Sequence, residues 1–248
     1  MTQALNLFKS HKEATEISVL DCKFHPSDID RFIVGTDSGQ ILNESRFRTR
    51  CHPRTYNLQD SNYGMIDGAT SLEFCPHDDR LFIAGYMSGM VGLFSVKERK
   101  AVVTWNASSH PIRLVRWSPQ RPAVFFVLDH HGILNIWDLS ESEAEPAHVV
   151  QTGDKGIGGN RLLVTFALSP TMSSAALSGS QATLAAAASK NATMLFGFAD
   201  GTSEVHLLDQ ILAEQAIDEE RALAVYTDGI GLRADETADD IYDNANLE

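Results

Sequence analysis

The chain has 248 residues, 43% of them hydrophobic and 21% charged, which is enough for one sizeable core or two small ones. Its net charge is −13, and residues 214–248 contribute eleven acidic and two basic residues to it. Because excess negative charge repels phosphate and anionic lipid, we expect no nucleic acid and no membrane surface as partner.

Residues 1–16 form an N-terminal segment without the apolar run of a signal peptide, and no later run reaches the roughly 18 residues that span a bilayer. The three cysteines, Cys22, Cys51 and Cys75, form no CxxC pair. Their odd number and wide spacing predict free thiols in a soluble intracellular protein.

Residues 17–46, 69–97 and 110–139 repeat one pattern. An alternating apolar run ends in an aromatic residue, one further residue and a proline, and a second apolar run with a glycine follows. The aromatic residue and the glycine are 15 residues apart in all three repeats. The aromatic, proline and glycine landmarks are Phe24, Pro26 and Gly39 in the first repeat, Phe74, Pro76 and Gly89 in the second, and Trp117, Pro119 and Gly132 in the third. The alternation predicts short strands, the proline ends the first, and the glycine turns a hairpin.

A fourth, weaker unit covers residues 162–208, with Asp200 and Gly201 at its turn. Its Ala/Ser-rich insertion, 171–192, predicts a solvated loop. Repeats that recur every 40 to 50 residues, with the dipeptide Trp137-Asp138, are typical of propeller blades. We therefore predict an all-β, WD-repeat β-propeller over 17–208, as a partial ring with three clear blades and a degenerate fourth.

The turn of the third repeat holds two adjacent histidines, His130 and His131. A metal or catalytic site needs ligands that converge from other elements. Many propeller repeats have a hydrogen-bonding aspartate at the place of His131, but the four repeats here read Ser38, Ser88, His131 and Asp200. We predict no catalytic residue, no metal and no cofactor, and we interpret His130 and His131 as turn residues or partner contacts. His110 fits the usual histidine place before an inner strand, although its aspartate partner is missing there.

Two further segments lie beside the repeats. The arginine-rich stretch 42–68 is interpreted as the outer part of a blade and an exposed connector, either a solvated loop or a contact surface for an acidic helix. Residues 209–224 predict a helix, packed on the last blade or free for a partner, because apolar residues recur at one-face spacing from just before it, at Leu208, Ile211, Leu212, Ala216 and Leu223. Residues 225–248 predict a disordered acidic tail.

The amino-acid sequence between the landmarks points to a more specific family than propellers in general. The segments "SLEFCPHDDRLFIAGYMSGMVGLF" and "VRWSPQRPAVFFVLDHHGILNIWDL" resemble the C-terminal propeller of dynein intermediate chains. They are most similar to the type found in cytoplasmic dynein 2, the intraflagellar-transport motor (the WD-repeat protein 60 type). The run from Trp117 to Phe125 is the strongest match, and the resemblance covers 17–139 well and 194–215 weakly.

This resemblance implies a non-catalytic subunit whose propeller binds the tail of a dynein heavy chain. It implies a role in retrograde intraflagellar transport and cilium assembly, in the cytoplasm and on the cytoskeleton, at the cilium or flagellum and its base. Other dynein 2 subunits, including light chains, are implied partners, although the region that recruits light chains is not visible. The family also has more blades, which leaves open a truncated gene model, a divergent short homologue or a half-ring completed by another chain.

The two rims of the blades are the natural contact surfaces, and Arg121 in "SPQRP" is a weak candidate contact on one of them. An alternative function is that of a WD-repeat adaptor in another complex, such as a substrate receptor of a ubiquitin ligase. A propeller enzyme with a central site is a further alternative. It is disfavoured by the unlike residues at the aligned turns, and the chain has no GxxxxGK[ST] phosphate loop.

Overall fold

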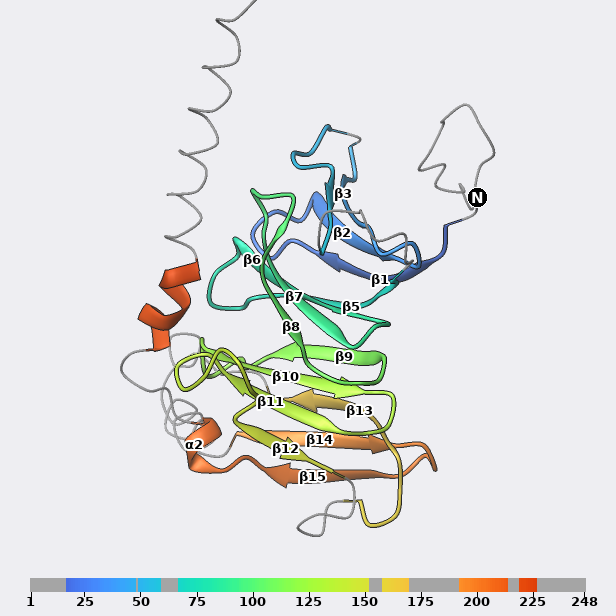
Figure 1. Ribbon diagram of the computed structural model, residues 1–248, viewed down its shortest axis with the longest axis vertical. Helices are drawn as coiled ribbons and strands as arrows, with labels where there is room; N and C mark the ends of the chain where they lie inside the picture. Colours follow the sequence, from blue (N-terminus) through green and yellow to red (C-terminus); the bar gives the residue numbers. More distant parts are fainter. Residues whose placement is uncertain are drawn as a thin grey trace, which may run out of the picture.

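The computed structural model describes residues 17–47, 49–58, 67–151, 158–169, 192–213 and 219–226. Their strands form four antiparallel sheets that follow one another in chain order (Figure 1). Blade 1 contains β1 (Val19–Phe24), β2 (Arg31–Thr36), β3 (Ile41–Ser45) and β4 (Thr55–Tyr56). Blade 2 contains β5 (Ala69–Phe74), β6 (Leu81–Tyr86), β7 (Met90–Ser95) and β8 (Ala101–Asn106).

Blade 3 contains β9 (Ile112–Trp117), β10 (Val124–Asp129), β11 (Leu134–Asp138) and β12 (His148–Val150). Blade 4 has three strands among the described residues, β13 (Leu163–Leu168), β14 (Thr193–Phe198) and β15 (Ser203–Leu207). Each repeat found in the sequence supplies the first three strands of one blade, and the fourth strands of blades 1 to 3 follow outside the repeats. This is the arrangement of WD-repeat propeller blades, and the described residues supply four strands to each of blades 1 to 3 and three strands to blade 4.

The core lies between the blades because the middle strands are buried on both faces. Every residue of β6 and of β10 is buried. The junction of blades 2 and 3 is centred on aromatic rings, among which Phe125 stacks on Trp137 with ring centroids 5.9 Å apart and planes 2° apart. A strand buried on both faces requires a neighbouring blade on each side, so packing between blades dominates the fold.

The innermost strands of blades 1 to 3 are joined by side chains. The Asp21 carboxylate on β1 accepts the N–H of Leu72 on β5 (2.8 Å). On β5, the Glu73 carboxylate accepts the N–H of Trp117 on β9 (2.5 Å), and Ser71 Oγ accepts the N–H of Val115 (3.2 Å). These bonds use the inner-strand amides that face the neighbouring blade and fix how β1, β5 and β9 lie against one another.

The four hairpin turns contain glycines in the left-handed region. Gly39, Gly89, Gly132 and Gly201 have φ angles of +83°, +89°, +80° and +84°. Glycine adopts such angles at little cost because it has no Cβ. At Gly89 there is also no room for one, because an added Cβ would lie 2.0 Å from the carbonyl oxygen of Ser108.

The C-terminal part is helical in two places. α2 (Gln210–Ala213) follows β15, and residues 219–226 form a second helix. The predicted helix 209–224 overlaps both, but Ala216 lies outside the described residues. The predicted tail began at Val225, which is wrong for its first two residues, since Val225 and Tyr226 belong to the helix and Tyr226 is buried. Residues 227–248 lie outside the description.

The N-terminal segment, the insertion before β14 and the cysteines were also predicted from the sequence. Residues 1–16 and most of the predicted insertion, through residue 191, lie outside the described residues. Ala192, assigned to the solvated insertion, is instead buried, and its carbonyl accepts the N–H of Leu208 (2.8 Å), because it directly precedes β14, the middle strand of blade 4. The three cysteines are free. No helix in the described ranges is long and apolar enough to cross a membrane.

Replacement of Gly89 by alanine tests the hairpin geometry. Gly89→Ala combines an unfavourable φ with a backbone clash, whereas Gly201→Ala has the same φ and nothing within 4 Å of the new Cβ. We expect Gly201→Ala to lower the free energy of unfolding by roughly 1–2 kcal/mol and Gly89→Ala to lower it by at least about 3 kcal/mol. Equal losses in denaturant titrations of the two variants would contradict the close approach.

The bond from Glu73 to Trp117 predicts a pH dependence. Burial raises the pKa of Glu73 from 4.5 to about 7, although Arg116 and the Trp117 N–H oppose this shift. The folded protein therefore holds a proton that the unfolded chain releases, and stability falls as pH rises from about 4.5 to about 7. In Glu73→Gln this contribution is absent. We expect the difference in unfolding free energy between wild type and variant to change by on the order of 3 kcal/mol over that range. A difference that is constant with pH would refute the assignment.

Candidate partner interface

The antiparallel order of the strands gives the blades two rims. The hairpin turns at 37–40, 87–89, 130–133 and 199–202 lie at one rim, which we call the tip rim. The loops at 25–30, 75–80 and 118–123 lie at the opposite rim, which we call the proline rim. In Figure 1 the tip rim is on the right and the proline rim is on the left, with both helices beside it.

Blade 3 has a buried carboxylate behind its two turn histidines. Asp129, the last residue of β10, is fully buried. One of its oxygens accepts the N–H groups of His131 (2.8 Å) and Ile133 (2.9 Å), and the other accepts the hydroxyl of Ser108 (2.8 Å). Both oxygens are thus engaged in shaping the turn, which identifies Asp129 as a structural residue.

His110 reaches the same carboxylate. Its Nδ1 lies 3.6 Å from Asp129 Oδ2, and its ring centroid lies 3.7 Å from that of His131. Position 131 holds no aspartate, and Asp129, two residues earlier at the end of the strand, takes that role. The sequence shows this aspartate directly before the two histidines. Its spacing alone does not predict that the side chain turns inward toward His110.

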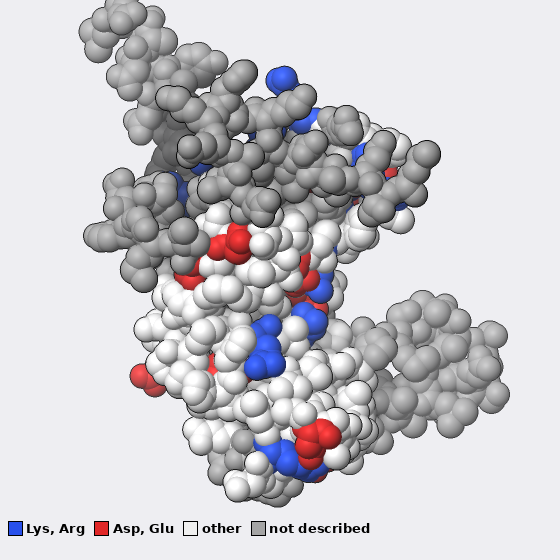
Figure 2. All heavy atoms as spheres, turned by 90° about the vertical axis from the view of Figure 1, so that its right-hand side faces the viewer, with Lys and Arg blue, Asp and Glu red and all other residues white. Residues whose placement is uncertain are grey.

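His130 and His131 are exposed on the tip rim. The pKa of His130 is lowered, first by partial desolvation and then by the positive charge of Arg113, so the neutral form is favoured. Both histidines remain candidate partner contacts. The tip rim faces the viewer in Figure 2, and most of its described surface carries neither positive nor negative side chains. A partner at this rim would meet a largely uncharged surface.

The other turns use their own polar partners. Asp67 accepts hydrogen bonds from the backbone N–H (2.7 Å) and the hydroxyl (2.5 Å) of Ser88. Asp200 accepts from the N–H (2.9 Å) and the hydroxyl (2.6 Å) of Thr202, which lowers its pKa. The described residues contain no group of three or more His, Cys, Asp or Glu side chains placed to bind a metal ion.

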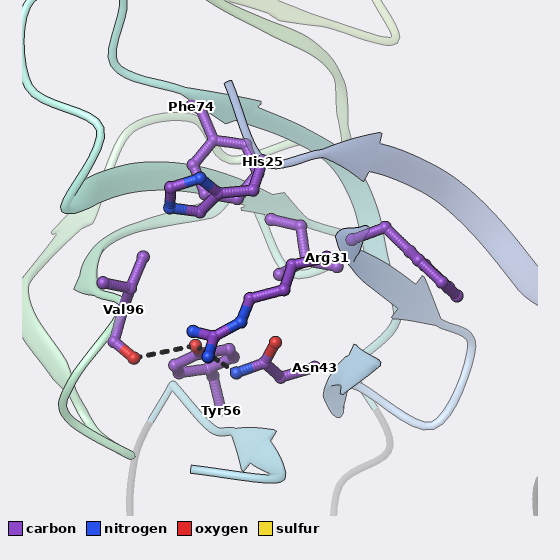
Figure 3. A pocket seen from close by; sticks show the side chains of 8 residues that line it. His25, Arg31, Asn43, Tyr56, Phe74 and Val96 are labelled. Carbon is purple, nitrogen blue, oxygen red and sulfur yellow. Dashed lines mark hydrogen bonds between the residues drawn. The ribbon is translucent and has the colours of Figure 1, made fainter. Parts of the chain in front are cut away.

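The proline rim is hollowed at the junction of blades 1 and 2 (Figure 3). The Tyr56 hydroxyl at the floor of this pit donates to the carbonyl of Val96 (3.0 Å) and accepts from the Asn43 amide (2.9 Å). The His25 ring packs edge-on against Phe74, with centroids 5.1 Å apart. The pit is small, with room for about one water molecule, and the Arg31 side chain also lines it.

A shallow groove adjoins the pit along the same rim, lined by Pro26, Ser27 and residues 75–80. Arg80 donates from Nε (2.9 Å) and Nη2 (2.7 Å) to the two oxygens of Asp78, and these bonds hold the pKa of Asp78 below its usual range. Ile29, on the neighbouring loop, is 71% exposed. This loop, 25–30, also supplies Pro26 and Ser27 to the groove.

Arg121, the predicted partner contact on this rim, is not available to a partner. Its side chain is only 4% exposed and forms ion pairs with Asp138 (Nη2 to Oδ2, 2.6 Å) and with Glu219 of the C-terminal helix, which is fully buried. The guanidinium points into the molecule because two carboxylates of the same chain neutralise it there. The prediction of a contact role is thereby corrected to a structural one.

Removal of the Arg121 side chain tests this burial. Arg121→Ala leaves two carboxylates without their shared cation, so we expect a loss of about 3–5 kcal/mol in unfolding free energy. Arg80→Ala, at an ion pair whose arginine is half exposed, should cost about 1 kcal/mol or less. Denaturant unfolding of both variants measures the difference, and losses of similar size would mean that the Arg121 network is not buried in solution.

No family model matches the chain. It is 32% identical over 142 residues to cytoplasmic dynein 2 intermediate chain 1 of Mus musculus, which covers 55% of this chain and 14% of the mouse protein. The human protein of that name is 32% identical over 151 residues, 60% of this chain and 14% of its own length.

A more distant relative is cytoplasmic dynein 1 intermediate chain of Drosophila melanogaster. It is 24% identical over 145 residues, which is 57% of this chain and 22% of the fly protein. The chain therefore spans a small part of the relatives it matches. The comparisons confirm its resemblance to dynein intermediate chains, and both relatives at 32% identity are intermediate chains of dynein 2.

Proposed function

We propose that the chain is a non-catalytic accessory subunit of cytoplasmic dynein 2. Its blades bind the tail of the dynein heavy chain and so serve retrograde intraflagellar transport and cilium assembly. The observation that carries this proposal is the 32% identity to two proteins named as dynein 2 intermediate chains, over more than half of this chain. Its place in the cell is then the cytoplasm and the cytoskeleton, at the cilium or flagellum and its base.

We further propose that the proline rim of blades 1 and 2 makes the contact with the heavy chain. Two features support this choice over the tip rim: the groove at the junction, and Ile29, which is exposed on the loop 25–30 that also lines the groove. An apolar anchor in a hollow with a polar border supplies most of the binding energy in typical interfaces. Light chains and other dynein 2 subunits are further proposed partners, and no residue is assigned to them.

A pair of matched substitutions tests both parts. The full chain is co-expressed with the N-terminal tail of the dynein 2 heavy chain from the same organism and analysed by size-exclusion chromatography. We expect a stoichiometric complex with the wild-type chain. Ile29→Asp on the proline rim should weaken it at least tenfold, because an acid replaces an exposed apolar contact. Met87→Asp makes the same change on the tip rim, at a residue 46% exposed, and should have little effect.

The possible outcomes separate the two parts. If the wild-type chain is soluble but does not bind the tail, the proposed dynein 2 function is wrong. An adaptor role in another complex is then favoured. If the wild-type chain binds but Met87→Asp is the weaker variant, the function stands and the choice of rim is wrong. Equal weakening by both variants would also reject the proline rim as the specific contact.

A further inference from the structure

The helix at residues 219–226 lies over the junction of blades 2 and 3 at the proline rim. In Figure 1 it is the red helix to the left of the sheets. Leu223 and Tyr226 are buried and belong to the apolar cluster shared by blades 2 and 3. Glu219, Leu223 and Tyr226 stand at positions i, i+4 and i+7, which is one face of a helix. The contacts to the blades are thus concentrated on a single stripe.

At the first position of the stripe, Glu219 forms an ion pair with Arg121 of the groove. The groove also supplies a second carboxylate for this arginine. Arg121 is held by Asp138 at 2.6 Å as well as by Glu219. Asp138 is fixed in turn by the N–H (3.0 Å) and the hydroxyl (2.5 Å) of Ser140. When Glu219 leaves, Arg121 still has a buried carboxylate beside it, so the groove does not depend on the helix for charge balance.

The groove wall at the other end of the stripe is also built without the helix. The Tyr226 hydroxyl donates to the Glu143 carboxylate (2.7 Å). The backbone carbonyl of Glu143 accepts the indole N–H of Trp105 from blade 2 (2.8 Å), and Glu141 and Ser142 donate their N–H groups to the carbonyl of Asp138. The segment that receives Tyr226 is therefore anchored to both blades by bonds that do not involve the helix.

We propose that this groove is a helix-binding site that residues 219–226 occupy in cis and that a separate helix can enter by exchange. The groove is defined by Trp105, Arg121, Asp138, Leu139 and Glu143. It takes an amphipathic helix with glutamate, leucine and tyrosine at positions i, i+4 and i+7. Most helical stability in proteins comes from packing of an amphipathic face, so the cis segment competes for the groove through this stripe. This inference is independent of the proposed dynein function.

The experiment uses a labelled peptide of residues 214–230 and the full-length chain. Its binding is measured by fluorescence anisotropy to the wild-type chain and to Leu223→Ala, in which the cis helix has lost its central apolar contact. We expect at least tenfold tighter binding to Leu223→Ala, because the cis competitor is weakened while the groove is intact. Val225→Ala, at a residue of the same helix that is 66% exposed, is the matched control and should behave as wild type.

Two further arms make the result decisive. A peptide carrying Leu223→Ala should lose its binding to the variant chain, which shows that the stripe is recognised. If the Leu223→Ala chain is unfolded by circular dichroism, Glu219→Gln replaces it, since that change keeps the shape and removes only the ionic contact. A less than threefold difference between wild type and the weakened chain overturns the proposal. A wild-type dimer that dissociates in Leu223→Ala would show that the helix enters the groove of a second copy, and would overturn the cis assignment.

Discussion

Packing between neighbouring blades is the constraint on which the rest of the structure depends. The middle strands β6 and β10 are buried along their whole length, and neither blade 2 nor blade 3 can bury both of its faces alone. Two carboxylates on the inner strands fix the relative position of neighbouring blades, because Asp21 and Glu73 each accept a backbone N–H of the next blade. The apolar faces bring the blades together, and these bonds set how one inner strand lies on the next.

The surfaces available to partners follow from this stacking. The proline rim is hollowed where blades 1 and 2 meet, and it is covered by the helix at 219–226 where blades 2 and 3 meet. The same rim therefore has a shallow open groove at one junction and a groove occupied by the helix at the next. Tyr56 and Arg121 illustrate the difference, since one closes the floor of a pit and the other anchors a helix.

The polar network at the tip rim is rebuilt differently in each blade. In blade 3 the acid comes from the strand end, at Asp129, and His110 and His131 lie over it. In blade 2 an acid before the inner strand, Asp67, binds a serine in the turn. A fixed set of side chains is thus not needed to hold the hairpins, provided that each buried or strained turn finds some acceptor for its N–H groups.

The repeats, the strands and the glycine turns were predictable from the sequence because they depend on residues close together in the chain. A strand such as β9 follows from alternation, and Gly89 and Gly132 mark turns that need a positive φ. The fourth strands of the blades escaped the repeat pattern because they are short or lie in connectors. The burial of Arg121 was decided only by the tertiary structure, since its partner Glu219 is 98 residues away. No local pattern predicts such a contact, because it exists only once the blades have stacked and the chain has returned to them.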